Sequence, residues 1–394
     1  MGVFKNNQLR FGKFFTKTLV KKFKTPLYVY EAETIRRQYL KLAKNVPYKK
    51  LDIHYACKAN TNVSILRLIR KLGAKAETVS REEIELALKA GFKPKDIIYT
   101  STSVSREELA FVVKNNIRVN LDSLSQIELY GKMNKGGGKV GIRINQGIGA
   151  GHHSHVITGG EMSKFGIPIE HLGQAQKLAK KHKLNITRLH QHIGSNVLDE
   201  KILIQAFDKL LETARVFPDL EALDFGGGFG VAYSPKEKGP DLKVYGTAVV
   251  KKMKEFCKEY GKELTMVLEP GRLLVAEAGT LLATVTEIKQ NPTRTFIGVD
   301  TGFNHLIRPI LYGSYHEIIN TKKRPGAGMT ADIVGNICES GDVFGRDRKI
   351  TPTKTGDILA IRNAGAYGYA MASHFNSRPL PGEILIDQGR ILKI

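Results

Sequence analysis

The sequence predicts an α/β protein, a (β/α)8 TIM barrel with a C-terminal all-β domain. From residue 51 to about residue 271, short apolar runs alternate with longer amphipathic stretches, as buried parallel strands alternate with crossover helices. Eight such units over about 220 residues suit a closed barrel, which typically has about 250 residues. After Gly271 the pattern changes to strand-like runs broken by Gly, Pro and Asn, which is typical of an all-β domain.

Each barrel strand can be assigned to one apolar run. The predicted strands are Leu51–Ala56, Ala74–Val79, Asp96–Thr100, Arg118–Leu121, Lys139–Ile144, Asn185–His190, Ala222–Phe225 and Thr265–Leu268. The predicted helices are Arg81–Ala90, Ser105–Asn115, Ser123–Met133, Pro168–Lys183, Asp199–Phe217 and Tyr245–Tyr260. An open, doubly wound sheet is the alternative architecture for the same alternation.

The domain limits follow from these runs. We expect residues 27–275 to form the barrel, and residues 1–26 with 276–394 to form the β domain. Leu27–Tyr30 could also add a strand to the β domain, because this run precedes the first long helix. The β domain's own predicted strands are Leu281–Ile288, Phe296–Val299, Ile358–Ile361 and Glu383–Ile386.

Charge and composition restrict the partners. The 394 residues carry a net charge of +23, from 61 Lys and Arg against 38 Asp and Glu, which raises the question of nucleic acid. The basic residues are spread along the chain without zinc-finger spacing or an aromatic-basic motif, so we expect no nucleic-acid partner. No apolar run approaches the roughly 18–20 residues that cross a bilayer, so we expect no membrane partner.

The cysteines and the N-terminal segment bear on location. Cys57, Cys257 and Cys338 have unrelated spacings, which gives no disulfide framework and no metal pair and fits a reducing cytoplasm. The first 26 residues are basic and contain no acid. An organelle-targeting peptide is one interpretation, but an apolar central region is missing, so an ordinary solvated start to the fold is favoured.

Lys58 directly follows the first predicted strand, and barrel enzymes act at the carboxyl ends of their strands. A lysine at this position is costly if its amine is buried and unpaired. Its stem could be buried while its amine reaches water. Alternatively, it could form a Schiff base in an enclosed site that lowers its pKa. The sequence leaves both interpretations open.

Three further strand ends carry unusual residues. His190 and His192 share a face by alternation. They could bind a metal ion, but no carboxylate or Cys stands near them in the sequence to complete such a site. They could instead be core histidines, or stack on an aromatic cofactor. The glycines 226–228 could bind a phosphate, because barrel enzymes usually bind phosphate in the loops that follow strands seven and eight. The glycines 136–138, by contrast, are typical of a turn. Glu269 could pair with Arg272, or face a pyridine nitrogen in a ring that accepts electrons during CO2 loss.

Seven motifs in order give the chain a family resemblance from about Thr25 to its C-terminus. They are Tyr55–Asn60, His192–Ser195, Gly226–Gly230, Glu269–Arg272, Arg308–Gly313, Cys338–Asp342 and Gly365–Tyr369. With them the sequence resembles the diaminopimelate decarboxylases, enzymes of the alanine-racemase-like fold that use pyridoxal 5'-phosphate (PLP). One departure is Cys57, where Val is more frequent in the family.

The resemblance implies a role for each motif residue. Lys58 would hold PLP covalently, His192 would stack on its ring and Glu269 would contact its ring nitrogen. The residues implied around the phosphate and cofactor are Ser195, Gly226, Gly227, Gly228, Gly271, Arg272 and Tyr367. Those implied to bind the substrate are Arg272, Arg308, Tyr312, Glu339 and Tyr367.

In this family the active unit is a homodimer. The resemblance implies that Cys338 returns a proton to the substrate carbon and that Glu339 takes the distal ammonium. Both would enter the site from the partner subunit. The segment Gly151–His155 resembles an active-site loop of the family, with metal binding as the other interpretation.

The implied reaction converts meso-2,6-diaminopimelate, a small amino acid, to L-lysine and CO2, the last step of lysine biosynthesis. One rival is a decarboxylase of the same fold acting on ornithine, arginine, lysine or carboxynorspermidine; relatives acting on basic monocarboxylic amino acids tend to have Asp where Glu339 stands. An alanine-type racemase would place Arg, not Glu269, at the ring nitrogen. A non-catalytic PLP carrier is disfavoured because Lys58 and Cys338 are both present.

Overall fold

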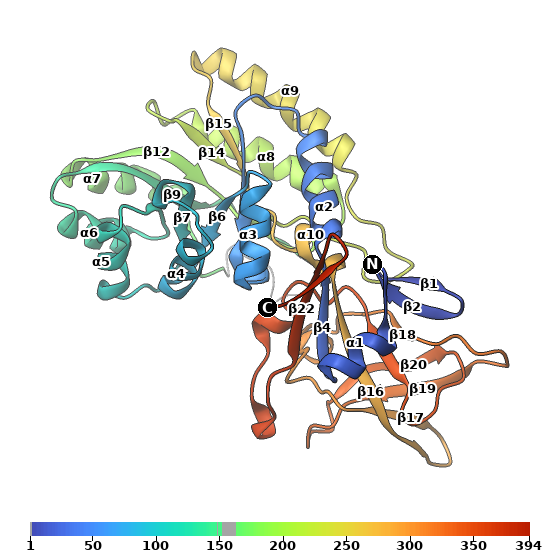
Figure 1. Ribbon diagram of the computed structural model, residues 1–394. Coiled ribbons are helices and arrows are strands. Elements are labelled where there is room, and N and C mark those ends of the chain that lie inside the picture. The colour runs from blue at the N-terminus through green and yellow to red at the C-terminus, as the bar shows by residue number, and fades with distance from the viewer. Residues whose placement is uncertain (1, 148, 152–162) are drawn as a thin grey trace. The chain divides into compact units, whose positions relative to one another are not determined.

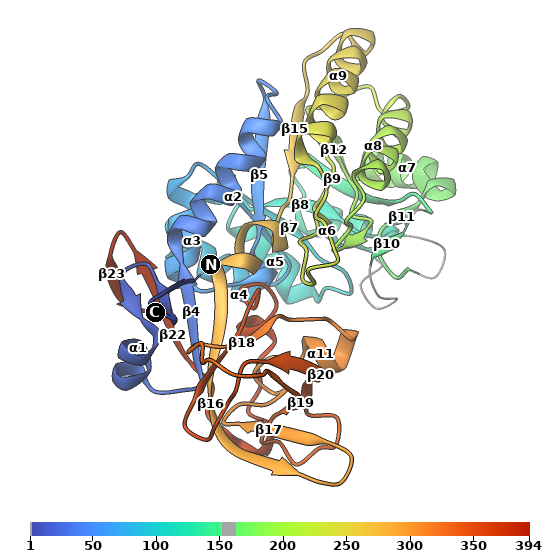
Figure 2. The ribbon, with the colours of Figure 1, turned by 90° about the vertical axis from the view of Figure 1, so that its right-hand side faces the viewer.

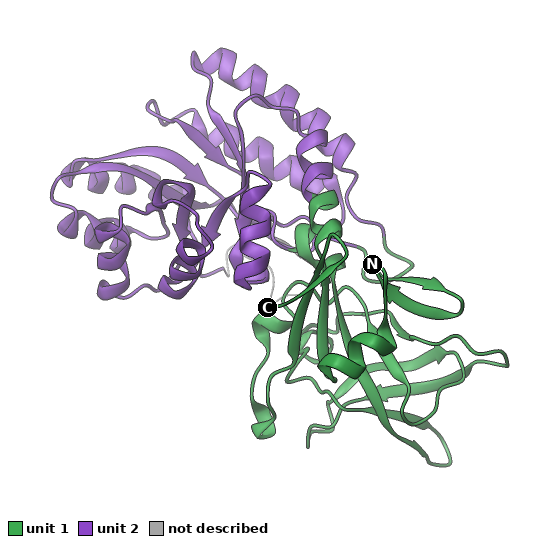
Figure 3. Cartoon of the chain, in the orientation of Figure 1, with its two compact units in different colours: residues 1–38, 232–237, 272–394 green, residues 39–231, 238–271 purple. Residues whose placement is uncertain are grey.

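The computed structural model describes residues 2–147, 149–151 and 163–394. The chain forms two compact units, coloured separately in Figure 3. Unit 1 comprises Met1–Gln38, Ala232–Glu237 and Arg272–Ile394, and unit 2 comprises Tyr39–Val231 and Lys238–Gly271.

Unit 2 is a closed parallel barrel. Its strands, in spatial order, are β9 (Gly138–Asn145), β12 (Leu184–His190), β14 (Ala222–Asp224), β15 (Thr265–Leu268), β5 (Leu51–Ala56), β6 (Lys75–Thr78), β7 (Ile97–Thr100) and β8 (Arg118–Leu121). Strand β8 then pairs with β9 through Asn120 and Gly141, and through Leu121 and Ile142. This last pairing closes the sheet, so the predicted barrel is confirmed and the open sheet is excluded.

Most helices of unit 2, with α7 as the exception, begin at a polar side chain that caps the first turn. The helices are α3 (Val63–Lys71), α4 (Arg81–Lys89), α5 (Arg106–Lys114), α6 (Leu124–Met133), α7 (Leu172–Lys181), α8 (Glu200–Ala214) and α9 (Leu242–Tyr260). Ser80, Ser105 and Ser123 each accept a hydrogen bond from the backbone three residues later, which satisfies an amide that the first helical turn leaves open. Figures 1 and 2 show these helices outside the strands.

Small parallel pairs lie beside the barrel strands. Strand β11 (Ile167–Pro168) pairs with β9, and β10 (Ala150–Gly151) pairs with β13 (Gly194–Ser195). The glycines 136–138 form the predicted turn into β9, with positive φ angles at Gly137 and Gly138.

Unit 1 is built on a mixed sheet. Its path is β20 (Val343–Ile350), β19 (Met329–Val334), β17 (Thr295–Val299), β16 (Gly279–Gln290), β4 (Leu27–Glu31), β22 (Gly382–Asp387) and β23 (Arg390–Lys393), while β18 (Ile318–Asn320) and β21 (Ile358–Ile361) pair off this path. The run at residues 27–31 therefore does supply a strand to this sheet. Two short helices, α10 (Arg272–Val275) and α11 (Arg308–Tyr312), interrupt the predicted all-β pattern.

The N-terminal segment is folded into unit 1. It forms the hairpin strands β1 (Val3–Lys5), β2 (Gln8–Phe11) and β3 (Phe14–Phe15), then α1 (Thr16–Phe23), and α2 (Ala32–Asn45) follows β4. Leu9, Phe11 and Leu19 are buried in one cluster with apolar residues of the sheet, while the lysines of the segment remain on its surface. Within the described part of the chain, none of the helices has the length and apolarity needed to cross a bilayer.

Candidate active site

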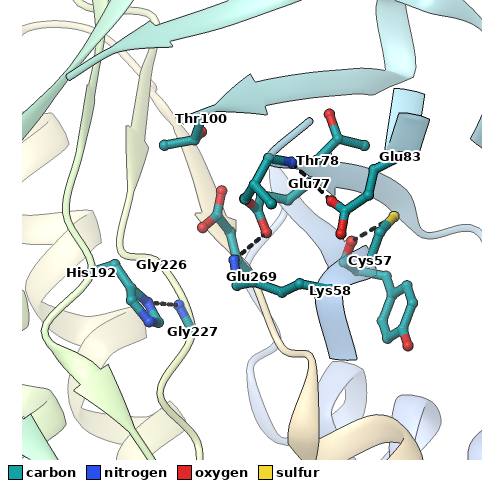
Figure 4. A network of polar contacts seen from close by, with 12 residues as sticks. Cys57, Lys58, Glu77, Thr78, Glu83, Thr100, His192, Gly226, Gly227 and Glu269 are labelled. Carbon is teal, nitrogen blue, oxygen red and sulfur yellow. Dashed lines mark hydrogen bonds and ion pairs between the residues drawn. The ribbon is translucent and has the colours of Figure 1, made fainter. Parts of the chain in front are cut away.

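Lys58 forms an ion pair at the carboxyl ends of the barrel strands. It lies on the short 3-10 helix η1 (Cys57–Ala59), directly after β5. Its Nζ is 2.7 Å from Oε2 of Glu77 on β6, as Figure 4 shows. The Glu77 side chain is almost completely buried. Lys58 is therefore held by a buried carboxylate, which favours the charged form of its amine.

Glu77 was missed by the sequence analysis. It lies in the apolar run of β6, on the same face as Lys75 by strand alternation. An acid within a barrel strand, one residue before that strand's carboxyl end, was the feature that could have revealed it.

A second buried cluster joins three strand ends. Nε2 of His190 lies 3.1 Å from Oε2 of Glu269, and Asp224 has a carboxylate oxygen within 4.8 Å of the ligand atoms of both. The interpretation that no carboxylate stands near these histidines is wrong. The acids are 34 and 79 positions from His190 in sequence but on neighbouring or nearby strands of the barrel.

Burial sets the charges of this cluster. Burial and then repulsion from Glu77 raise the pKa of Glu269 to about 8, and burial with repulsion from Glu269 raises the pKa of Asp224 well above its usual value. Burial lowers the pKa of His190 to about 4. At neutral pH Glu269 therefore keeps its proton and the His190 imidazole is neutral.

The glycine loop after β14 lies against His192. The N–H of Gly227 donates to Nδ1 of His192 at 3.2 Å. A Cβ at Gly226 would lie 2.2 Å from the Gln191 carbonyl oxygen, and one at Gly227 would lie 2.3 Å from that of Glu269. Gly226 also has a φ of +67°. The close backbone approach thus requires glycine at both positions.

These side chains line one cavity of about 330 Å³ within unit 2. Lys58, Glu77, His190, His192 and Glu269 contribute to its wall, and the other lining residues are Val79, Thr100, Ser101, Thr102, Arg143 and Phe165. Lys58 and Glu269, from the first and last barrel strands, therefore face the same space. This volume is in the range of small-molecule and cofactor sites.

Arg143 is a further wall residue that the sequence analysis did not single out. Its guanidinium is buried, lies 3.7 Å from Asp122 and sits over the ring of Phe165 at 4.5 Å. It is a cation inside a barrel strand, so the same reasoning that reveals Glu77 would have revealed it.

Unit 1 contains two arginines that hydrogen-bond to the Tyr233 hydroxyl. Nη1 of Arg272 donates to the Tyr233 hydroxyl at 2.8 Å, and Nη1 of Arg308 donates to the same oxygen at 3.0 Å. Arg308 also donates to Ser314 at 3.0 Å. Its side chain is 1% exposed, so Arg308 is buried within unit 1.

Tyr367 and Tyr312 belong to the same unit. The guanidinium of Arg272 lies 4.9 Å from the ring centre of Tyr367, whose backbone has a φ of +56°. A positive φ at a bulky residue is unusual and is often found at functional sites. Tyr312 is the last residue of α11 and is half-buried.

The remaining predicted residues lie as follows. Ser195 is half-buried in β13, and Gly271 packs against Ala56 and Ala59 on either side of Lys58. Cys338 and Glu339 are exposed on unit 1, and the N–H of Cys338 donates to Asn376. Cys57 is fully buried and points away from the Lys58 side chain in Figure 4. The histidines of the 152–155 segment lie outside the described residues.

A parallel barrel with a lysine after its first strand and a buried acid after its last defines a class of enzymes that tether an aldehyde cofactor. The comparisons with known proteins agree with this class. Residues 32–276 match the family "Pyridoxal-dependent decarboxylase, pyridoxal binding domain". The chain is 41% identical to the diaminopimelate decarboxylase of Methanothermobacter thermautotrophicus, over 95% of this chain and 89% of the relative.

Solved structures that resemble this chain are also diaminopimelate decarboxylases. The diaminopimelate decarboxylase of M. jannaschii in complex with L-lysine has a TM-score of 0.92 at 33% identity, covering 100% of this chain and 94% of that one. The Helicobacter pylori diaminopimelate decarboxylase with L-lysine has a TM-score of 0.89 at 35% identity, covering 96% and 95%. The chain belongs to the diaminopimelate decarboxylase family of pyridoxal-dependent decarboxylases.

The residues of the barrel fit this cofactor. Oε1 of Glu269 is buried and makes no hydrogen bond to the described residues, so it is open to a ring nitrogen. The glycines 226 and 227 leave room that side chains would fill, and Lys58 supplies the amine. The donor set therefore matches a pyridoxal group in charge, space and reactive nitrogen.

Proposed function

We propose that this protein decarboxylates meso-2,6-diaminopimelate to L-lysine and CO2, as the last step of lysine biosynthesis, with PLP as its cofactor. The observation that carries the proposal is that Lys58 and Glu269 line one cavity in the barrel. The names of the relatives and the L-lysine complexes of two similar structures support the choice of substrate.

Lys58 would hold the cofactor covalently through Nζ and release it to the substrate amine. When bound, the cofactor supplies a protonated ring that accepts the electron pair left as CO2 departs. Glu77 would stabilise positive charge at the Lys58 nitrogen, since its carboxylate is 2.7 Å away. Gly271, packed against the residues flanking Lys58, would keep η1 in place.

Glu269 would hold a proton between its Oε1 and the ring nitrogen. Its raised pKa, about 8, means that the carboxyl arrives protonated at neutral pH and can share that proton with a basic ring nitrogen. Neutral His190 at 3.1 Å would fix the other oxygen, Oε2. His192 would lie against the face of the ring, with its Nδ1 held by the Gly227 N–H.

The cofactor's phosphate would be bound by backbone N–H groups and hydroxyls. We assign this role to Ser195, the glycines 226–228, Gly271 and Tyr367, with Arg272 as a further cofactor contact. Glycine loops after late barrel strands form such oxyanion sites because their amides can converge.

Arg272, Arg308 and Tyr312 would bind the carboxylate that the substrate keeps. A guanidinium pairs with a carboxylate through two parallel hydrogen bonds. The Tyr233 oxygen accepts from both arginines, which fixes their spacing, and its own hydrogen remains available as a donor. Ornithine has only the carboxylate that is lost, so this arrangement favours diaminopimelate.

We further propose a homodimer in which each site takes Cys338 and Glu339 from the partner subunit. In the single chain both side chains are exposed, as residues that complete a neighbour's site would be. Cys338 would return a proton to the substrate carbon, and Glu339 would bind the distal ammonium. A reducing, cytoplasmic location is supported by the three cysteines, all of which are free thiols.

The proposal is tested by assaying the purified protein with PLP against diaminopimelate, ornithine, arginine and lysine. We expect L-lysine and CO2 from diaminopimelate, with kcat/KM at least about 100-fold above that for ornithine, since ornithine lacks the carboxylate that would form the bidentate ion pair. A preference for ornithine or arginine would overturn the substrate assignment, and no CO2 from any of them would overturn the reaction.

A further inference from the structure

A second cavity of unit 2, of about 380 Å³, lies at the opposite mouth of the barrel from Lys58. It is formed where the strands begin: Lys75, Arg118 and Ala222 are the first residues of β6, β8 and β14, and all three line it. Its charged lining residues are Asp52, Lys75, Arg118, Lys139, Arg188 and Glu221. This end of a barrel is ordinarily associated with stability and not with catalysis.

The charges of this cavity do not balance. Its four cations and two acids leave a net charge of +2. Asp52 pairs with Lys75, and Glu221 pairs with Lys139 at 2.6 Å, so both acids are already engaged by lysines. Across the described ranges, neither Arg118 nor Arg188 has a carboxylate within ion-pair distance.

The interior behind the cavity holds further titratable groups. Burial, followed by the cations Arg188, Lys75 and Arg118, lowers the pKa of His54 well below its usual value, so this imidazole is neutral. Asp224, Glu269 and Asp52 attract Arg188, while Arg118 repels it; burial and repulsion from Glu269 raise the pKa of Asp224 well above its usual value. Two like charges thus share the mouth, and neither forms an ion pair with a described carboxylate.

Polar atoms at this mouth also lack partners. The Nε of Arg188 is buried and makes no hydrogen bond to any described residue. Both ring nitrogens of His54, which is 1% exposed, also make no hydrogen bond to any described residue. Buried donors without partners are uncommon in folded proteins, and a bound ion is one explanation for them.

A glycine that lines the cavity lies on the strand between those that carry the two arginines. Gly141 on β9 pairs in register with Arg188 on β12 and with Asn120 on β8, the strand that begins at Arg118. A Cβ at Gly141 would lie 2.0 Å from Oδ1 of Asn120, so the buried Asn120 side chain occupies the space beside this glycine. Gly141 therefore lets Asn120 lie against β9, between strands that carry one arginine each.

We propose that this mouth binds a small dianionic oxyanion, a phosphate or a short dicarboxylate, between Arg118 and Arg188. The net charge of +2 matches a dianion, and two guanidiniums offer paired donors of the kind that oxyanions accept. The site goes beyond the decarboxylase activity and does not depend on it. Its occupant would stabilise the barrel by neutralising the repulsion between the arginines.

The test is a calorimetric titration of the PLP-loaded protein with inorganic phosphate at constant ionic strength. Loading with PLP keeps the cofactor's own phosphate site filled. We expect one saturable site per chain with a Kd of about 1 mM or below, and about 10-fold weaker binding in Arg118→Gln and in Arg188→Gln. Arg106→Gln, an exposed arginine of α5, is the matched control and should bind as the wild type does.

Parallel titrations with sulfate and succinate identify the ligand class. Tighter binding of phosphate and sulfate assigns a tetrahedral anion, and tighter binding of succinate assigns a dicarboxylate. No saturable binding of any of them to the wild type would overturn the proposal, as would unchanged binding in a variant that combines Arg118→Gln with Arg188→Gln. If the variants do not fold, a wild-type crystal soaked in selenate tests the site instead. Anomalous density between the two arginines would support the proposal, and the lack of such density would contradict it.

Discussion

Nζ of Lys58, which directly follows β5, lies 2.7 Å from Oε2 of Glu77 on the neighbouring strand β6. Glu77 is 1% exposed, so its negative charge acts in a poorly solvated site. The same charge acts on Glu269, whose pKa rises through burial first and repulsion from Glu77 second. Glu77 therefore acts both on the amine proposed to hold the cofactor and on the acid proposed to face its ring.

Replacing Glu77 should make the positive form of the cofactor-bound lysine less stable. In Glu77→Gln, the pH at which the visible absorbance of the PLP-loaded protein changes should fall by about 1 unit, because the nitrogen loses its nearest carboxylate. The measurement is a spectrophotometric pH titration. The control is Glu85→Gln, an exposed acid of α4 that pairs with Arg81. A midpoint that stays or rises would show that Glu77 does not act on this nitrogen.

Glu269 should make the cofactor-free protein less stable as pH rises. A carboxyl whose pKa is about 8 when folded and about 4.5 when unfolded keeps a proton that the unfolded chain has lost. Its stabilising contribution is complete below about pH 4.5 and is lost as pH rises through 8, with a slope of up to about 1.4 kcal/mol per pH unit.

Glu269→Gln removes this ionisation and keeps the shape of the side chain. Urea unfolding from pH 5 to 8 should therefore show the variant gaining stability relative to the wild type as pH rises. The wild-type and variant proteins share Glu83, whose pKa is also raised by burial, so its effect cancels in the difference. A difference that is constant with pH would contradict a raised pKa at Glu269.

Tyr233→Phe should weaken binding of diaminopimelate. The variant keeps the ring, which lies 4.5 Å from the Arg308 guanidinium, and loses the oxygen that accepts from Arg272 and Arg308. We expect KM to rise about 10-fold, equivalent to about 1.4 kcal/mol, with a much smaller change in kcat.

The matched control for Tyr233 is Tyr245→Phe, a buried tyrosine of α9, which should leave both constants near the wild-type values. Circular dichroism melts of both variants check folding. An equal rise in KM for ornithine, which lacks the second carboxylate, would show that Tyr233 does not act through the carboxylate-binding arginines.

Mixing two inactive variants tests the shared site. Lys58→Ala and Cys338→Ser should each lack activity as homodimers, but unfolding and refolding them together forms mixed dimers with one intact site. Random pairing then restores about a quarter of the wild-type activity. Recovery that does not exceed the sum of the separate variants would place Lys58 and Cys338 of the same chain in one site.

The barrel could be predicted because its strands are local patterns. All eight apolar runs correspond to strands, with ends that differ by about one residue, and Lys58 and Glu269 fall at strand ends as expected. The pairing of Lys58 with Glu77, and of His190 with Glu269, could not be read from the chain. Both depend on which strands become neighbours when the barrel closes, and that closure is a tertiary property.

Other features were missed for a related reason. Tyr233 follows the glycine loop but hydrogen-bonds to arginines 39 and 75 positions later. The strand β18 of unit 1 has three residues, too few for a clear alternation. Charged residues inside strands, such as Arg143 and Arg188, depart from the apolar pattern because the barrel interior is polar at both mouths.

The most direct test of the account combines Lys58→Ala with a spectrum and a CO2 assay on diaminopimelate. The wild type reconstituted with PLP should show a visible absorbance band from the lysine-bound cofactor and should release CO2 and L-lysine. The variant should lose the band and at least about 1,000-fold of the turnover, the scale of a missing covalent group. A variant that keeps both the band and the activity would show that the cofactor is not held at Lys58, and the central claim would be wrong.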